Sequence, residues 1–315
     1  METKKQPRAE HVVLISVDGL LPSFYLDERW PAPAMQQIYR EGAHAAAVPG
    51  VFPALSYPGH TTLATGALPA RHGILHNREI APVDEPAWLK DASLIQVPAL
   101  WDAVRARGAT SAAVLWPLTA GAAIDWCLPD IWPGDQKDLV AAIRDNTTPA
   151  GLFEELEREA TGRLTHESFN NKSLTHDLQV ALMARYLFEH YRPTLLMLHA
   201  QSANQVLQEP DWRNPRRRRA VAASDQVVSV LLEVIERTKA WETTAVIVTG
   251  DHGNTEVHTQ LRPNVWLVEA GLRGKQLDGN DWRATFHALG GSAFLRVNDP
   301  AAENEAAVRR ILDAL

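Results

Sequence analysis

Two stretches of the chain place possible cation ligands directly after short apolar runs. Asp18 ends HVVLISVD, while Asp251 ends TTAVIVTGD and is followed by His252. Glycine lies next to each acid, in VDG and GDHG, and allows the backbone to turn sharply. Carboxylates combined with an imidazole form a donor set suited to zinc or manganese. We therefore take these residues as candidate metal ligands; the alternative for a lone acid at a strand end is a helix cap or a loop hydrogen-bond acceptor.

A candidate nucleophile lies in residues 51–77, VFPALSYPGHTTLATGALPARHGILHN. Ser56 precedes YPGHTTLATG, which predicts a helix with Pro58 in its first turn. The positive dipole end and free N–H groups of a helix N-terminus favour a phosphate or an alkoxide. The alternative is that the Ser56 hydroxyl only caps the helix.

The candidate residues lie at the ends of expected strands. Continuous apolar runs, typical of strands buried on both faces of a sheet, occur at 11–18, 110–116, 194–199 and 243–251. Helical patterns occur at 32–42, 97–108, 174–191 and 217–240. This alternation predicts an α/β fold with a mostly parallel central sheet sandwiched by helices. Ligands of such sheets bind beyond the carboxyl ends of the strands, where we expect the candidate residues to meet.

The sequence does not indicate a clear domain boundary. We expect a single domain over 1–315, because no stretch has the composition of a linker. Residues 120–172 are richer in Pro, Asp, Asn and Gly, and we predict a cap insertion there. Towards the C-terminus we expect strands at 264–271 and 292–297 and a closing helix over 303–315.

Composition narrows the class of protein. The 315 residues carry a formal net charge of −7, which gives no general attraction to a nucleic-acid polymer or an anionic membrane. We interpret Arg216 to Arg219 as a solvated helix start. No segment approaches the ~18 consecutive apolar residues of a membrane span, and the single cysteine, Cys127, excludes an internal disulfide. We therefore expect a cytoplasmic protein; the sequence does not indicate an oligomeric state.

Three stretches together resemble a known family. LISVDGL, FPALSYPGHTTLATGALPARHGILHN and VTGDHG, in this order and spacing, resemble the type I phosphodiesterase / nucleotide pyrophosphatase branch of the alkaline phosphatase superfamily. The resemblance covers most of the chain. It implies an alkaline phosphatase-like fold and a metal-dependent phosphoric ester hydrolase acting on a small phosphoester or a nucleotide.

The resemblance also implies roles for single residues. Ser56, where the branch more often has threonine, would be the nucleophile and form a phosphoryl-enzyme intermediate. Asp18, Asp251 and His252 would hold, with Ser56, a divalent cation, expected to be zinc, with manganese or magnesium as alternatives. Asn77 would donate a hydrogen bond to a phosphoryl oxygen. These roles are chemically coherent, because a cation lowers the pKa of a hydroxyl and an amide neutralises developing charge.

The sequence departs from the family pattern at the ligand positions of the second metal ion. That site needs an Asp, a His four residues later and a distant His, but RPTLLMLHAQSANQVLQEPD places Asn204 and Gln208 at the first two positions. Shifting the register pairs Ser202 with Val206 or Gln201 with Gln205, and the distant histidine has no match before Leu315. Neutral amides bind zinc weakly, so we expect one ion rather than two. We interpret His199 as a core histidine and His258 and His287 as surface or loop residues.

The missing ligands also support a second hypothesis for the function of the chain. The alternative is a catalytically weak or inactive superfamily member that binds a nucleotide, a phosphoester or a protein partner. A sulfatase or mutase is less favoured, because Ser56 is followed by Tyr57-Pro58-Gly59-His60, with His where a sulfatase requires Arg.

Overall fold

The protein is described by a computed structural model covering 9–80, 86–133, 138–167, 169–170, 173, 175–209, 215–274, 282–298 and 301–313. The chain divides into two compact units. The first unit comprises Met1–Leu75 and Lys90–Asn254, and the second comprises His76–Leu89 and Thr255–Leu315. Asp18, Ser56, Asp251 and His252 all belong to the first unit. The single domain and the cap at 120–172 stay predictions.

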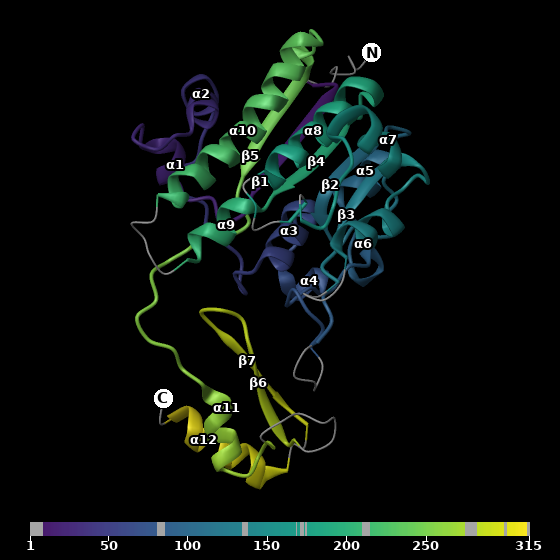
Figure 1. The fold of residues 1–315 in the computed structure, drawn as a ribbon. Helices are drawn as coiled ribbons and strands as arrows, with labels where there is room; N and C mark the ends of the chain where they lie inside the picture. Colours follow the sequence, from purple (N-terminus) through teal and green to yellow (C-terminus); the bar gives the residue numbers. More distant parts are fainter. Residues whose placement is uncertain are drawn as a thin grey trace, which may run out of the picture. The chain divides into compact units, whose positions relative to one another are not determined.

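A five-stranded sheet forms the centre of the first unit (Figure 1). Its strands are β1 (His11–Val17), β2 (Ser111–Pro117), β3 (Trp126–Asp130), β4 (Leu195–Ala200) and β5 (Thr244–Thr249). They run parallel in the order β3-β2-β4-β1-β5, which confirms the predicted fold class. Strand β3 has no clear strand pattern in its sequence, because it contains Pro129; at the edge of the sheet the missing N–H of proline is tolerated.

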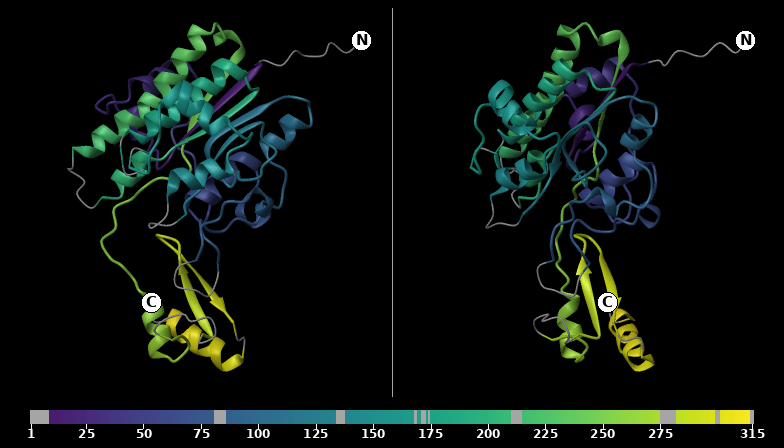
Figure 2. Two further views of the ribbon diagram at one scale, coloured as in Figure 1. Left: turned by 45° about the vertical axis from the view of Figure 1, so that its right-hand side comes forward. Right: turned by 90° about the vertical axis from the view of Figure 1, so that its right-hand side faces the viewer.

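Helices cover both faces of this sheet (Figure 2). One face packs against α8 (His176–Tyr191) and α10 (Arg216–Arg237), and the other against α3 (Ser56–Thr65) and α5 (Leu100–Arg105). Within β1, Val13 and Ile15 enter the core on the α8 side, whereas Leu14 enters the core on the α3 side. Both faces of β1 are therefore buried, which explains why its sequence is continuously apolar.

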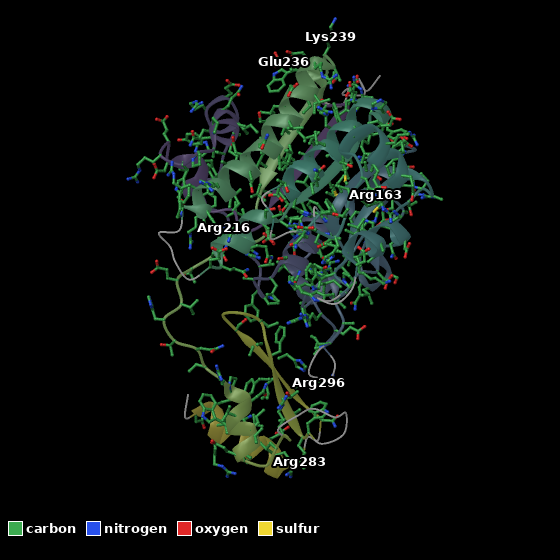
Figure 3. The ribbon with its side chains drawn as sticks, in the orientation of Figure 1. Arg163, Arg216, Glu236, Lys239, Arg283 and Arg296 are labelled. Atoms are coloured by element: carbon green, nitrogen blue, oxygen red, sulfur yellow. The ribbon has the colours of Figure 1, made fainter. Side chains whose placement is uncertain are left out.

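Shorter helices complete the first unit. They are α1 (Ser23–Leu26), α2 (Pro33–Glu41), α4 (Pro69–His72), α6 (Leu139–Asn146), α7 (Leu152–Leu156) and α9 (Ser202–Leu207), with 3-10 turns at Ala92–Leu94 and Trp241–Thr243 and a π-helical turn at Glu157–Thr161. The arginine run begins α10, where Arg216 lies at the exposed end of the helix and pairs with Glu209 at 2.6 Å (Figure 3). Within the described part of the chain, no helix is both long and apolar enough to cross a membrane.

The second unit has a small core of its own. It contains α11 (Pro263–Glu269), an antiparallel pair of β6 (Ala284–Ala288) with β7 (Ala293–Val297), and α12 (Ala302–Asp313). The predicted strand at 292–297 and the closing helix are confirmed. The predicted strand at 264–271 is wrong, because this run forms α11. A short apolar run does not distinguish the two structures, and Pro263 in the first turn favours a helix.

Candidate active site

The pairing of β1 with β5 brings the candidate ligands together. The two strands are parallel and in register, with Ser16 beside Thr249, so Asp18 and Asp251 follow them at the same edge of the sheet. Gly19 turns the chain away at a φ of +71°, and its N–H donates to Oδ1 of Asp251 at 3.2 Å. The β1 and β5 ends are therefore joined directly at the candidate site.

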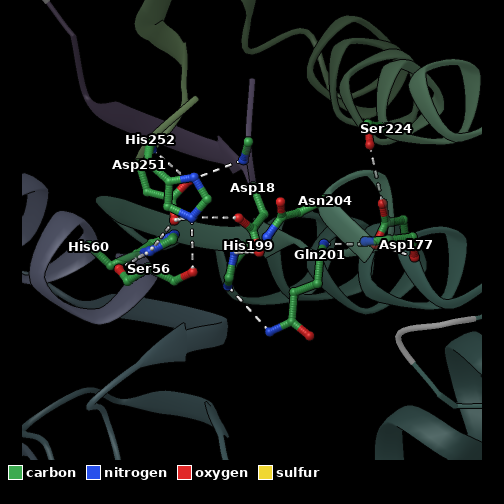
Figure 4. Close-up of polar contacts among 12 residues, drawn as sticks. Asp18, Ser56, His60, Asp177, His199, Gln201, Asn204, Ser224, Asp251 and His252 are labelled. Atoms are coloured by element: carbon green, nitrogen blue, oxygen red, sulfur yellow. Dashed lines mark hydrogen bonds and ion pairs between the residues drawn. The ribbon is translucent and has the colours of Figure 1, made fainter. Parts of the chain in front are cut away.

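The donor atoms surround Nε2 of His252 (Figure 4). This nitrogen lies 3.3 Å from Oδ1 of Asp18, 3.4 Å from Oδ2 of Asp251 and 3.3 Å from Oγ of Ser56. Ligand atoms of a tetrahedral zinc with bonds near 2.0 Å lie about 3.3 Å apart. The spacing and the chemistry of this donor set therefore fit a cation such as zinc.

Hydrogen bonds leave the inward-facing atoms available. Nδ1 of His252 lies 3.1 Å from the carbonyl of Gly253, which can only accept, so Nδ1 carries the proton and Nε2 keeps its lone pair. Oδ1 of Asp251 accepts from the backbone N–H of His252 at 2.9 Å as well as from Gly19. Oδ2 of Asp251 and Oδ1 of Asp18 are buried and have no hydrogen-bond partner among the described residues. Such atoms are costly to bury unless a ligand binds them.

Ser56 is the first residue of α3, not its cap. The N-cap position is Leu55, and no side chain caps this helix, so the reading of Ser56 as a capping residue is wrong. Its hydroxyl instead faces His252. Helix α3 can approach this closely because residue 59 is glycine, where an added Cβ would lie 2.8 Å from the backbone oxygen of Asp251.

Burial and charge act together on Asp18. Burial, and then the neighbouring charge of Asp251, raise the pKa of Asp18 well above its ordinary value, while a hydrogen bond from Asn204 opposes the shift. Two buried carboxylates are unfavourable side by side unless positive charge compensates them. A bound cation would provide that charge.

Two histidines that the sequence analysis did not treat as ligands border the same space. His60 lies one turn after Ser56 on α3, and its Nδ1 is 2.7 Å from the carbonyl of Ser56 and 3.5 Å from Oδ2 of Asp251. His199 on β4 is buried, as expected, with Nε2 3.8 Å from Oδ2 of Asp18. Burial lowers the pKa of both imidazoles, which favours their neutral form. The i, i+4 spacing of Ser56 and His60 is the signal that could have revealed His60.

The predicted positions of the degenerate second site are occupied by amides. Asn204 is buried on α9, where it hydrogen-bonds Asp18, and its Oδ1 accepts from Nδ2 of Asn254 at 3.1 Å. Gln208 is exposed just after α9. The loss of the second family site stays a prediction.

Three further residues from the sequence analysis belong to the second unit. The backbone carbonyl of Asn77 accepts from the N–H of Leu89 at 3.0 Å, and its predicted catalytic role stays a prediction. His258 is exposed, and His287 is half-buried in β6.

Known proteins resemble this chain over most of its length. The sequence model of the type I phosphodiesterase / nucleotide pyrophosphatase family matches residues 12–314. The human ectonucleotide pyrophosphatase/phosphodiesterase family member 5 is 24% identical over 257 residues, which are 80% of this chain and 46% of that protein. The Xenopus laevis bis(5'-adenosyl)-triphosphatase enpp4 is 25% identical over 252 residues, covering 77% of this chain and 46% of that protein. The chain thus spans about half the length of these relatives.

Solved structures share the fold. An inactive variant of murine ectonucleotide pyrophosphatase/phosphodiesterase 5 in complex with AMP has a TM-score of 0.65 and 19% identity, covering 95% of this chain and 69% of that one. Phosphonoacetate hydrolase from Sinorhizobium meliloti in complex with phosphonoacetate has a TM-score of 0.61 and 18% identity, covering 96% and 73%. The fold, the order of the motifs and the family match agree, and the chain belongs to the type I phosphodiesterase / nucleotide pyrophosphatase family.

Proposed function

We propose that this chain is a metal-dependent phosphoric ester hydrolase that cleaves a phosphodiester or pyrophosphate bond through a phosphoryl-Ser56 intermediate. Family membership supports the reaction class. The observation that carries the proposal is the convergence of Ser56 Oγ, Asp18 and Asp251 around Nε2 of His252 at 3.3–3.4 Å. No cap or loop role of these residues accounts for that convergence.

The residues that would hold the cation are Asp18, Asp251, His252 and Ser56. Zinc suits this donor set, and manganese or magnesium would require added water ligands. When bound, the cation lowers the pKa of the Ser56 hydroxyl and offsets charge that develops on the phosphoryl group.

The chain's own residues then perform two displacements. Oγ of Ser56 forms a bond to phosphorus while the bond from phosphorus to the leaving oxygen breaks, and the serine proton passes to solvent. The positive end of α3 stabilises negative charge at the phosphoryl group. Water next attacks phosphorus, breaks the Oγ–phosphorus bond and leaves Ser56 protonated again.

A nucleotide or aryl ester is the substrate class that we propose. The murine relative was solved with AMP. Within the first unit of this chain, a cavity of about 410 Å³ borders Asp251 and His252 and is lined by apolar and aromatic residues that include Tyr25, Tyr39 and Leu63. Such walls favour a flat apolar group next to the phosphoester.

The test compares matched serine variants. Zinc-loaded protein should hydrolyse bis(p-nitrophenyl) phosphate and accumulate a covalent phosphoryl adduct after acid quench. Ser56→Ala should lose the adduct and about 10³-fold in kcat or more. Ser93→Ala, at an exposed serine, should behave as the unmodified protein. Equal turnover by the Ser56→Ala variant would contradict the proposal, and AMP binding without any turnover would favour an inactive binder.

A further inference from the structure

We propose that the cavity beside Asp251 and His252 binds an uncharged aromatic group of the substrate and disfavours a group that carries a second phosphate or a carboxylate. The inference rests on the proposed function in one respect, because it places the reacting phosphoryl group at Ser56. It narrows the proposed substrates to phosphodiesters whose recognised group is neutral and aromatic, such as an aryl ring or a nucleobase.

The cavity borders the candidate cation ligands. It has a volume of about 410 Å³, and Asp251, His252 and Gly59 are among its lining residues. Gly59 belongs to α3, which begins at Ser56. Oγ of Ser56 lies 3.3 Å from Nε2 of His252, so a phosphoryl group bound at this hydroxyl would be next to the cavity. A substituent of that phosphoryl group therefore has the cavity within reach.

The walls of the cavity are mostly apolar. They come from α2, from α3, from the end of β5 and from the stretch that follows β1. Their larger apolar side chains are those of Leu20, Leu21, Met35, Ile38, Leu63 and Val248. Such walls favour an apolar group, because moving its surface out of water is favourable.

Aromatic rings form part of the wall. The ring centroid of Tyr39, on α2, lies 4.4 Å from that of His44 and 6.3 Å from that of Tyr25 on α1. All three residues line the cavity. The hydroxyl of Tyr25 donates to the carbonyl of Ala45 at 2.9 Å, which ties α1 to the loop after α2. This cluster offers ring faces and edges against which an aromatic group can pack.

The charges around the cavity disfavour an anion. Among the residues that the structure describes, no lysine or arginine lines the cavity, and its one acidic lining residue is Asp251. A cation held by Asp18, Asp251 and His252 would offset charge on the reacting phosphoryl group. A second phosphate or a carboxylate in the cavity would lose hydration without a cation to compensate it, which is unfavourable. The cavity therefore selects a neutral group.

The rim of the cavity is an exposed part of the chain before α3. Residues 43–50 form neither helix nor strand, and all of them are exposed. Val48 lies in this stretch, lines the cavity and is 76% exposed. A substitution at Val48 can therefore change the charge at the cavity without disturbing the core.

The experiment measures the binding of phosphonates to the zinc-loaded full chain by isothermal titration calorimetry. A phosphonate carries a single substituent, so its affinity reports on one bound group. Phenylphosphonate should bind about tenfold more tightly than methylphosphonate, and 4-carboxyphenylphosphonate about tenfold more weakly than phenylphosphonate. Titration at pH 8 keeps exposed imidazoles uncharged. Equal affinities within either pair of compounds would overturn the proposal.

Variants assign these differences to the cavity. Tyr39→Ala should reduce the preference for phenylphosphonate over methylphosphonate about fivefold. Trp241→Ala, at a 47% exposed aromatic residue outside the cavity, should retain the full preference. Val48→Lys should strengthen the binding of 4-carboxyphenylphosphonate about threefold, whereas Val48→Gln should not. An unchanged preference in folded Tyr39→Ala would overturn the proposal; if this variant does not fold, the Val48 pair decides the question.

Turnover separates this inference from the proposed function. Selective binding of phenylphosphonate, lost in Tyr39→Ala, without hydrolysis of any phosphoester would support the cavity proposal and refute the hydrolase proposal. Hydrolysis of bis(p-nitrophenyl) phosphate that depends on Ser56, in a protein that binds phenylphosphonate and methylphosphonate equally, would refute the cavity proposal alone.

Discussion

The ends of β5 and β4 lie on either side of β1 at the same edge of the sheet, yet they carry different chemistry. β5 leads into Asp251 and His252, whose donor atoms converge with Ser56 at the spacing of cation ligands. β4 leads into α9, where Asn204 engages Asn254 and Asp18 through amide hydrogen bonds. The sheet therefore brings the residues after β4 and after β5 to the same edge, but only the residues after β5 provide a carboxylate and an imidazole.

The β4 end is held by hydrogen bonds from a buried carboxylate. Asp177, buried on α8, accepts from the backbone N–H of Gln201 at 2.9 Å, from the N–H of Ser202 at 3.1 Å and from the Ser202 hydroxyl at 2.9 Å. These bonds satisfy the start of α9. The fold therefore needs this corner of the sheet whether or not α9 supplies metal ligands.

The largest effect is expected on the β5 side. Asp251→Asn keeps the shape of the side chain and removes its charge, so it should lose bound zinc and about 10³-fold in kcat. Steady-state kinetics and metal analysis measure the two losses. Asp145→Asn, at an exposed acid on α6, is the control. Full activity of the zinc-free Asp251→Asn protein would show that the carboxylate after β5 is not needed for activity.

Asp130, at the end of β3, is a third acid at this edge of the sheet, and its pKa is shifted mainly by burial. Burial raises the pKa of Asp130 to about 6, against the opposing hydrogen bonds of Gln201 and Tyr57. The folded chain thus holds the proton more tightly than the unfolded chain, whose Asp has a pKa near 3.8. Stability from this residue is present below pH 3.8 and is lost as the pH rises through 6.

The loss should amount to at most about 3 kcal/mol, since each pKa unit corresponds to about 1.4 kcal/mol. Urea unfolding in chelator, from pH 4 to pH 7, should show this decline relative to Asp130→Asn. A constant difference between the two proteins over that range would mean that Asp130 does not titrate differently in the folded state.

Restoring a charge on the β4 side should be costly without metal. Asn204→Asp adds a buried carboxylate beside Asp18, and in chelator it should lower the free energy of unfolding by about 2 kcal/mol. Zinc should reverse most of that loss, because a cation compensates the added charge. Thermal unfolding with and without zinc measures both effects. Gln205→Glu adds the same charge on the same helix at a half-buried position and should respond little to zinc.

The smallest effect belongs to Gln208. Its side chain is exposed, so Gln208→Ala should change activity and the free energy of unfolding by no more than about 0.5 kcal/mol. A larger loss of zinc or of kcat would show that the β4 side still contributes a ligand, and would weaken the contrast with the β5 side.

The elements of the central sheet that were predicted from the sequence are those with a clear local hydrophobic pattern. The buried strands and the acids at their ends follow from continuous apolar runs such as 11–18. The antiparallel pair in the second unit and the helix at 263–269 were harder, because short apolar runs fit either structure. The position of His199 near Asp18 depends on the pairing of β4 with β1, which sets His199 beside Ser16, 183 positions earlier in the chain, and no local pattern encodes that pairing.

The glycine at position 59 has a consequence for how this protein can change. Because the space that a methyl group would fill there is taken by the backbone of Asp251, helix α3 lies directly against the chain that follows β5. Any side chain at residue 59 would push α3 away from Asp251 and lengthen the distance between the Ser56 hydroxyl and His252, so the absence of a Cβ at this position keeps the two side chains in reach of each other.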